Sequence, residues 1–176
     1  RALEAAEKGY FAEEIVPIEI KTKIGTTIID RDEEPTKVNF DKVRTLRPAF
    51  KADGVVTAAN ASSINDGAAA LVVASNEYAN KNNLKPIAKI IAHVSYAQEP
   101  EWFTTAPTFA IQKLLKKVNM TVDDIDLFEV NEAFSVVSII TAKNLNIPYD
   151  KMNIHGGAVS IGHPIGASGA RILTTL

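Results

Sequence analysis

Strand-like and helix-like patterns alternate along the chain from Gly54 to Leu176, and this alternation limits the choice of fold more than any other feature. Short apolar runs that suit β-strands cover residues 55–57, 87–94, 125–130 and 153–155. Longer patterns with helical spacing of apolar residues cover residues 67–80, 107–118, 132–146 and 167–176. Because such an order is typical of sheets with helices packed on their faces, the sequence predicts a mixed α/β fold.

Two sequence signals predict how individual helices begin. Asp66 precedes the pattern over 67–80 and is its predicted N-cap. The segment from Thr121 to Asp124 has the residue types of a capping box, which predicts one short helical turn there.

The first 53 residues differ from the rest in charge density. They hold 21 of the 40 Asp, Glu, Lys and Arg residues, whereas the following 123 residues hold 19. Residues 1–9 have the pattern of a helix end capped by Gly9, and the alternation over 15–20 predicts an edge strand. Neither end of the chain carries a helix start or stop signal, so we expect it to be part of a longer protein.

The composition excludes several kinds of chemistry within the chain. It contains no cysteine, which excludes disulfides, Cys-ligated metal sites and a thiol nucleophile. The formal net charge of −2 provides no general attraction to nucleic acid or to an anionic membrane. No run approaches the roughly 20 apolar residues needed to span a bilayer. We therefore expect a soluble intracellular protein without a nucleic-acid or membrane partner.

The segment 153–169 carries the strongest functional signal, because it places five glycines, two histidines and two serines in 17 residues. Glycine-rich turns at a helix start let backbone N–H groups face a ligand oxygen, and His163 lies among them, with Pro164 restricting the backbone after it. This pattern suits a general base or an oxyanion donor. A tight strand-to-helix connection with a surface histidine would use the same residues. The spacing matches neither a Rossmann fingerprint nor a P-loop.

A second cluster lies at residues 129–134, where a predicted strand ends and a helix begins, which is a common place for ligands in α/β proteins. Asn131 and Glu132 are the candidate functional residues. Taken alone, helix capping is the better explanation for Asn131, and a favourable charge at the helix start explains Glu132.

A third cluster is basic and extends from Lys37 to Lys51, where Asp41 is the only acidic residue. It could bind phosphate or form a solvated face. His155 and His163 lack the i, i+4 spacing of helical metal ligands and have no clear third ligand, so a zinc-type site is not expected.

The segment 153–169 resembles the C-terminal signature of the thiolase family, N-x-x-G-G-x-[aliphatic]-[S/A]-x-G-H-P-x-G-x-S-G. Three further blocks, at 56–62, 65–71 and 131–134, resemble thiolase blocks in the same order, so the resemblance covers the whole chain. It implies a layered αβαβα fold, of which this chain would hold a part. The implied domains are the end of a loop domain with its CoA-binding segment at 1–63, the closing segment of the N-terminal core domain at 64–86, and most of the C-terminal core domain at 87–176.

The resemblance also implies catalytic roles. His163 would activate the nucleophilic cysteine and help bind the thioester oxygen, and Asn131 would hold the water that completes the oxyanion hole. Both catalytic cysteines of the family would lie outside this chain, so the chain alone is predicted to be inactive.

Further positions are implied for ligands. The implied CoA-binding residues are Ser62 at the pantetheine, Phe103 and Phe134 along the acyl and pantetheine channel, and Lys37, Val38 and Lys42 near the phosphorylated ADP end. Some acetoacetyl-CoA thiolases bind potassium through backbone carbonyls, which here correspond to Ala58, Ala59, Ala61 and Val159.

The blocks at 56–62 and 157–160 are most similar to those of thiolases that condense two acetyl-CoA molecules into acetoacetyl-CoA and CoA, or catalyse the reverse thiolysis. The alternatives are a 3-ketoacyl-CoA thiolase of fatty-acid β-oxidation and a non-catalytic thiolase-like module that binds CoA or lipid. The implied substrates are CoA thioesters, with no required cofactor beyond the potassium ion of some members. The resemblance further implies a homotetramer or dimer, in the cytosol or the mitochondrial matrix.

Overall fold

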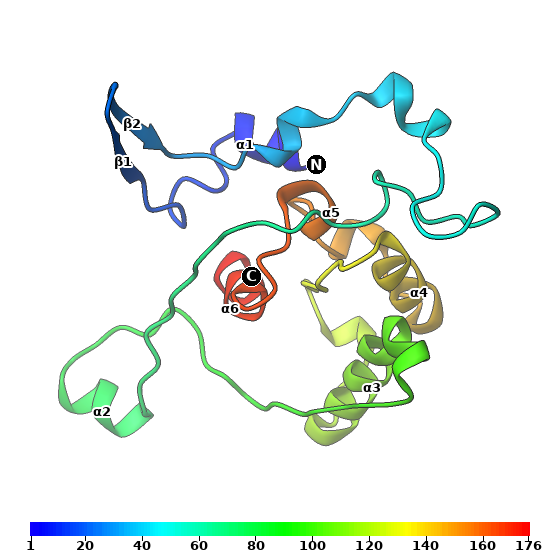
Figure 1. The fold of residues 1–176 in the computed structure, drawn as a ribbon. Helices are drawn as coiled ribbons and strands as arrows, with labels where there is room; N and C mark the ends of the chain where they lie inside the picture. Colours follow the sequence, from blue (N-terminus) through cyan, green and yellow to red (C-terminus); the bar gives the residue numbers. More distant parts are fainter.

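The computed structural model describes residues 1–176, and the helices of its C-terminal half lie around one region of the molecule (Figure 1). The α-helices are α1 (Ala2–Glu7), α2 (Asn76–Lys81), α3 (Ala106–Val118), α4 (Ser135–Leu145), α5 (Ala158–Ile161) and α6 (Ser168–Thr175). The two strands, β1 (Ile18–Thr22) and β2 (Gly25–Ile29), form an antiparallel hairpin in which Ile18 pairs with Ile29. Short 3₁₀ segments are η1 (Glu34–Lys37), η2 (Phe40–Thr45), η3 (Pro100–Thr105), η4 (Val122–Asp124) and η5 (Tyr149–Lys151).

The core lies between α3, α4 and the segments on either side of α4. Its buried members are Phe128, Val130, Val137, Ala142, Leu145, Ile147 and Met152. The helix α3 turns a half-buried stripe that includes Ile111 and Leu115 toward the interior and leaves Lys116 exposed, as its sequence period predicts. Packing against this core explains why the helices in this part of the chain form close to where their patterns predict them.

Several local predictions are confirmed. The predicted helices over 107–118, 132–146 and 167–176 correspond to α3, α4 and α6. Gly9 follows α1 with a left-handed φ of 72°, and the capping box between Thr121 and Asp124 is present. As a separate observation, which tests none of these predictions, no helix of the structure has the length and apolar character needed to cross a bilayer.

The predicted helix over 67–80 is wrong in its first half. The helix α2 begins at Asn76, and its N-cap is Ser75, whose hydroxyl accepts a hydrogen bond from the backbone N–H of Tyr78. Residues just before this region are held extended instead, since Ile64 forms a parallel bridge with His163. This tertiary pairing overrides the helical spacing that predicts Asp66 as the cap.

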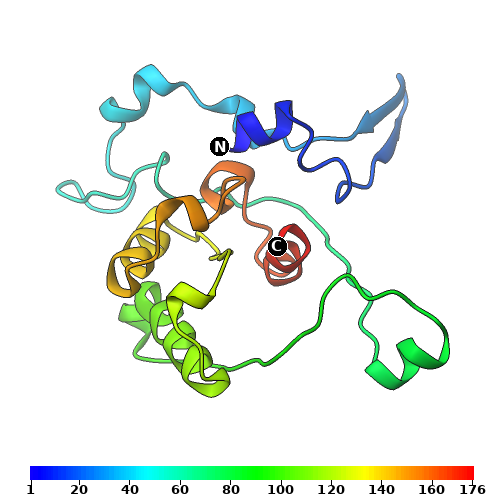
Figure 2. The same cartoon turned by 180° about the vertical axis from the view of Figure 1, so that it is seen from behind.

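The predicted strands over 55–57 and 87–94 do not form, and the run over 125–130 pairs only through one bridge between Phe128 and Met152. The predicted strand over 153–155 is wrong, because these residues form a turn directly after Met152. A strand requires a neighbour for its backbone groups, and these segments find few within this chain. The long segment that carries α2 runs away from the helices in both views (Figures 1 and 2).

Large apolar side chains on these segments are therefore uncovered, among them Val72, Val73, Ile87, Ile90 and Ile91. The accessible surface is 13258 Å², whereas a compact monomer of this mass exposes about 8,400 Å². The best-packed part of the chain is the region around α3 to α6, which also holds the main sequence motifs.

Candidate functional site

The backbone of His163 is held by the extended segment at residues 63–65. Its N–H donates to the carbonyl of Ser63 at 3.2 Å and to Oδ1 of Asn65 at 3.1 Å. Gly162 precedes it with a φ of 98°, and a Cβ at Gly162 would lie 2.5 Å from Asn65 Oδ1. Glycine is thus required at this position, both for the left-handed backbone and for the close approach of Asn65.

The imidazole of His163 is oriented by Ser168 at the start of α6. Ser168 Oγ lies 2.6 Å from His163 Nδ1 and also donates to the carbonyl of Pro164 at 3.1 Å. Because a hydroxyl has one proton to donate, Ser168 accepts from Nδ1–H, which leaves Nε2 with its lone pair. Burial lowers the pKa of His163 from its usual value, and the positive charge of Arg171 lowers that pKa further. The side chain is therefore a neutral imidazole with a free basic nitrogen near pH 7.

The free nitrogen faces the second predicted residue. Asn131 Nδ2 lies 3.4 Å from His163 Nε2, so the structure brings together the two residues for which the sequence implies catalytic roles. Asn131 Oδ1 is buried and has no hydrogen-bond partner. A buried acceptor without a partner is rare in folded proteins and points to a missing donor such as water or a ligand.

Helix capping does not explain Asn131. The helix α4 begins at Ser135, and its N-cap is Phe134. Residues before Ser135 are extended because Ala61 and Phe134 form an antiparallel bridge. The capping interpretation is therefore wrong, and Asn131 is available for another role.

Glu132 does not line a helix start; its carboxylate is a hydrogen-bond acceptor that joins neighbouring segments. Its Oε1 accepts hydrogen bonds from Ser138 Oγ at 2.8 Å and from Asn153 Nδ2 at 3.1 Å. Asn153 also clamps Val130, with its Oδ1 accepting from the backbone N–H at 2.8 Å and its Nδ2 donating to the carbonyl at 2.9 Å. These contacts fix the segment that carries Asn131. Sequence reasoning assigned no role to Asn153, although the glycine-rich motif begins with it.

A cavity of about 380 Å³ opens beside Asn131. It is lined by Phe103, Pro107, Ala110, Ile111, Glu129, Val130, Asn131, Ala133, Val137 and Ile172. Apart from Glu129 and Asn131 these side chains are apolar. The cavity therefore suits an apolar or weakly polar group whose reactive end approaches Asn131.

The aromatic residues implied for a channel also lie together. The ring of Phe134 meets the rings of Phe103 and Phe50 edge to face, with centroids 6.1 Å and 6.4 Å apart. Ser62 is half-buried, and its hydroxyl donates to the carbonyl of Ala133, the residue before Phe134, at 2.9 Å.

The basic cluster is exposed, and Asp41 is not its only counter-charge. Lys37 Nζ lies 2.7 Å from Glu34 Oε1 and 3.4 Å from Glu33 Oε2, because η1 places these residues one turn before it. Val38 and Lys42 are exposed. The cluster thus contains a lysine with acidic neighbours and another on the open surface of η2.

The residues implied for potassium come from two segments. Ala58 and Ala59 lie in the turn before the bridge formed by Ala61, and Val159 lies on α5. The chain holds no cluster of three or more His, Cys, Asp or Glu side chains suited to a metal ion.

Comparison with known proteins relates the whole chain to one family. The model "Thiolase, N-terminal domain" matches residues 1–77, and "Thiolase, C-terminal domain" matches residues 84–176. A probable acetyl-CoA acetyltransferase of Dictyostelium discoideum is 49% identical over 177 residues, covering 100% of this chain and 43% of that protein.

Two solved structures are similar in fold. The Bacillus anthracis acetyl-CoA acetyltransferase has a TM-score of 0.94 at 42% identity, with 99% of this chain and 45% of that chain covered. Human mitochondrial 3-ketoacyl-CoA thiolase has a TM-score of 0.89 at 34% identity with the same coverage of 99% and 45%. The chain spans less than half the length of these relatives.

Proposed function

Because this chain belongs to the thiolase family, we propose that it supplies the general base and part of the oxyanion hole of an acetyl-CoA C-acetyltransferase. The reaction is the condensation of two acetyl-CoA molecules to acetoacetyl-CoA and CoA, or the reverse thiolysis. The observation that carries the proposal is the 3.4 Å approach of Asn131 Nδ2 to His163 Nε2.

In the proposed mechanism, His163 Nε2 removes the proton from a cysteine thiol that lies outside this chain. The resulting thiolate attacks the acetyl carbonyl, and a C–S bond forms while the electron pair moves to oxygen. The tetrahedral intermediate then expels the CoA thiolate, which takes up a proton, and the acetyl group stays on the cysteine as a thioester. A neutral imidazole is the form that can accept the first proton, and burial of His163 favours that form.

Asn131 would act through water. A water molecule that donates to the unpartnered Oδ1 of Asn131 keeps a second proton for the thioester oxygen. Protonated His163 would donate to the same oxygen from Nε2. Two donors aimed at the oxygen on which charge develops are the usual arrangement of an oxyanion hole.

For the CoA part of the substrate we propose the residues that the family resemblance implies. Phe103 and Phe134 would line the channel, since their rings meet edge to face beside the cavity. Ser62 would contact the pantetheine. Near the phosphorylated end, Lys42 and Val38 lie on the open surface, and the exposed ion pairs of Lys37 are weak enough to exchange for a phosphate.

We also propose a potassium site. Backbone carbonyls are neutral oxygen donors, which suit a monovalent cation better than a transition metal. The carbonyls that would hold it are those of Ala58, Ala59, Ala61 and Val159. A rise in melting temperature with potassium but not with lithium, at constant ionic strength, is expected.

The test is an assay of the protein that contains this chain, with acetoacetyl-CoA and CoA as substrates. His163→Ala is expected to lower kcat by about 10² to 10⁴. Near-normal turnover of this variant would remove His163 from the mechanism. For Lys42→Ala we expect a raised KM for CoA with little change in kcat, because the contact is far from the reacting carbon.

The same assay separates the alternatives. Similarity to the human 3-ketoacyl-CoA thiolase keeps the 3-ketoacyl-CoA thiolase alternative open, although its identity of 34% is lower than the 42% shared with the Bacillus anthracis acetyl-CoA acetyltransferase. Faster turnover of a C8 than of a C4 ketoacyl-CoA would favour that alternative. Tight binding of CoA without turnover of either would favour a non-catalytic module.

A further inference from the structure

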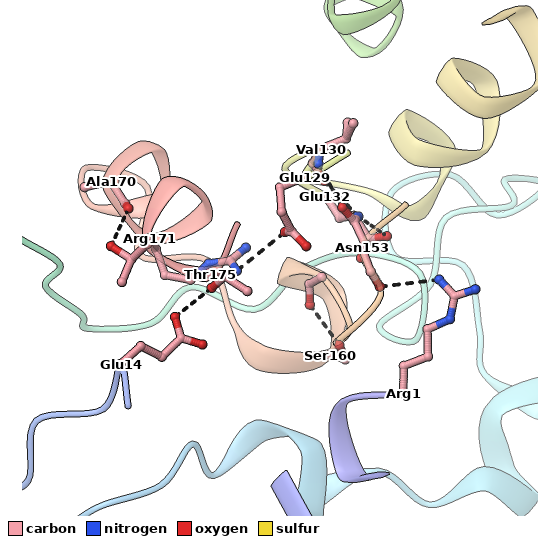
Figure 3. A network of polar contacts seen from close by, with 12 residues as sticks. Arg1, Glu14, Glu129, Val130, Glu132, Asn153, Ser160, Ala170, Arg171 and Thr175 are labelled. Carbon is pink, nitrogen blue, oxygen red and sulfur yellow. Dashed lines mark hydrogen bonds and ion pairs between the residues drawn. The ribbon is translucent and has the colours of Figure 1, made fainter. Parts of the chain in front are cut away.

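A buried ion pair lies behind the proposed base, and the mechanism above does not use it. The side chain of Glu129 is 5% exposed and that of Arg171 is 18% exposed. Arg171 Nη1 lies 3.8 Å from Glu129 Oε2, which accepts no hydrogen bond (Figure 3). Burying two such charges costs free energy that their attraction only partly returns, so the pair is poorly explained by stability alone.

The two ends of the pair lead to the two residues of the site. Glu129 lies two positions before Asn131, on the segment that Asn153 clamps. Arg171 lies one turn after Ser168 on α6, and Ser168 holds the imidazole of His163. The pair thus connects the segment that carries Asn131 with the helix that orients His163.

Resting on the proposed function, we propose that Glu129 and Arg171 are positioning residues that hold Asn131 beside His163 and tune the basicity of His163. Arg171 supplies a positive charge near the imidazole, and Glu129 offsets that charge when it is ionised. Neither residue touches the reacting atoms in this arrangement.

Other polar and acidic groups lie around the guanidinium of Arg171. Thr175 Oγ1 accepts from Arg171 Nη1 at 3.2 Å and donates to Glu14 Oε2 at 2.9 Å (Figure 3). Burial raises the pKa of Asp32, and Arg171 opposes that rise. Glu14, Asp32, Glu129 and Glu132 are therefore the acidic groups around the pair.

Electrostatics agree with the geometry. Burial raises the pKa of Glu129 to about 7, with Arg171 acting against the rise and with Glu132 and Glu14 adding to it. The same guanidinium lowers the pKa of His163. The charge on Glu129 thus changes in the pH range in which His163 must stay neutral, and the two groups are coupled through Arg171.

The experiment uses the protein that contains this chain with ¹³C-labelled histidine. The His163 imidazole is titrated by NMR without substrate and assigned with His163→Asn. Glu129→Gln removes the ionisable carboxyl with little change of shape. Because the Glu129 pKa of about 7 leaves this carboxyl only partly ionised where His163 titrates, its loss should lower the pKa of His163 by less than Arg171→Met raises it. Arg171→Met keeps the aliphatic stem and should raise that pKa. Asp126→Asn, an exposed carboxylate on the same segment, is the matched control and should leave it unchanged.

Opposite shifts from the two single variants support the proposal, because loss of packing alone would not produce opposite signs. Shifts of the same sign, or no shifts, would overturn it. If either single variant does not fold, the double variant Glu129→Gln/Arg171→Met, which leaves no unpaired buried charge, takes its place in the comparison. It differs from the folded single variant by one charge, and a His163 pKa that is the same in both would equally overturn the proposal.

Steady-state kinetics of the same variants provide a second measurement. Each single variant should lose about tenfold to a hundredfold in kcat with an unchanged KM for CoA, as expected for misplaced catalytic groups. A fall in kcat that conservative Arg171→Lys does not partly restore would count against tuning by charge. Failure of the wild-type protein to catalyse acetyl transfer would refute the proposed function, whereas the titration would still test the pair.

Discussion

Asn153 should be among the most sensitive positions of the site, although it touches no substrate. It is 4% exposed, and its side chain pairs with both backbone polar groups of the buried residue Val130. Replacing it with alanine leaves one N–H and one carbonyl unsatisfied, each costing about 1 to 3 kcal/mol. Asn153 also has a left-handed φ of 46°, which costs alanine about 1 kcal/mol more. The expected loss in free energy of unfolding for Asn153→Ala is therefore about 3 to 7 kcal/mol.

Two further variants separate these contributions. Asn153→Gly removes the side chain without the backbone strain, so it should be about 1 kcal/mol less destabilising than Asn153→Ala. Asn146→Ala is the matched control, since Asn146 has a similar φ of 54° and an exposed side chain. It should lose only the strain energy of about 1 kcal/mol.

The measurement is urea denaturation of the protein that contains this chain. The free energies of unfolding are compared between variants that have the same m-value. A loss for Asn153→Ala that matches the loss for Asn146→Ala would refute the reasoning, because it would mean that the hydrogen bonds to Val130 contribute nothing net. Acetyl-transfer activity should fall with stability in the Asn153 series, since the same bonds hold the segment that carries Asn131.

Three further predictions concern the same region. Gly157→Ala would place a Cβ against the Glu132 carboxylate and should destabilise the protein by about 1 to 3 kcal/mol in thermal unfolding. At Gly169 a Cβ would meet open space, so Gly169→Ala should be neutral or stabilising by up to about 1 kcal/mol in the same measurement. Because the folded pKa of Glu129 is about 7 against 4.5 for the free group, the folded state binds the proton more tightly. Its contribution to stability should therefore fall by up to about 3 kcal/mol as pH rises from 4.5 to 7, and Glu129→Gln should remove that slope from pH-dependent denaturation. Burial lowers the pKa of His163, so kcat/KM should stay level from neutral pH to below 6.5 and fall only when the imidazole is protonated; a fall that starts above pH 7 would contradict this assignment.

Local sequence signals predicted those elements that depend on nearby residues. The helix α3 is recognisable from its apolar stripe, and the capping box at Thr121 depends on a contact across three positions. His163 and Asn131 could be singled out by motif, but their mutual approach could not be derived from spacing, because they lie 32 positions apart.

The failed predictions share a cause. Helical spacing over residues 67–80 favours a helix, yet the backbone just before it bonds to His163 and stays extended. Asn131 has the residue type of a cap, yet the bridge at Phe134 moves the start of α4 to Ser135. In both places a long-range contact outweighs a local preference that amounts to less than about 1 kcal/mol per residue.

The sequence by itself determined the family, the types of residue in the site and the amphipathic helices, since each of these depends on residue identity and short spacing. Only the tertiary structure decided that Nε2 of His163 is the free nitrogen, that Asn131 is not a cap, and that Glu129 and Arg171 are a buried pair behind the site. These properties depend on which distant groups exclude water from one another. Desolvation and hydrogen-bond partnership arise between segments that are far apart in the chain, and no local pattern encodes them.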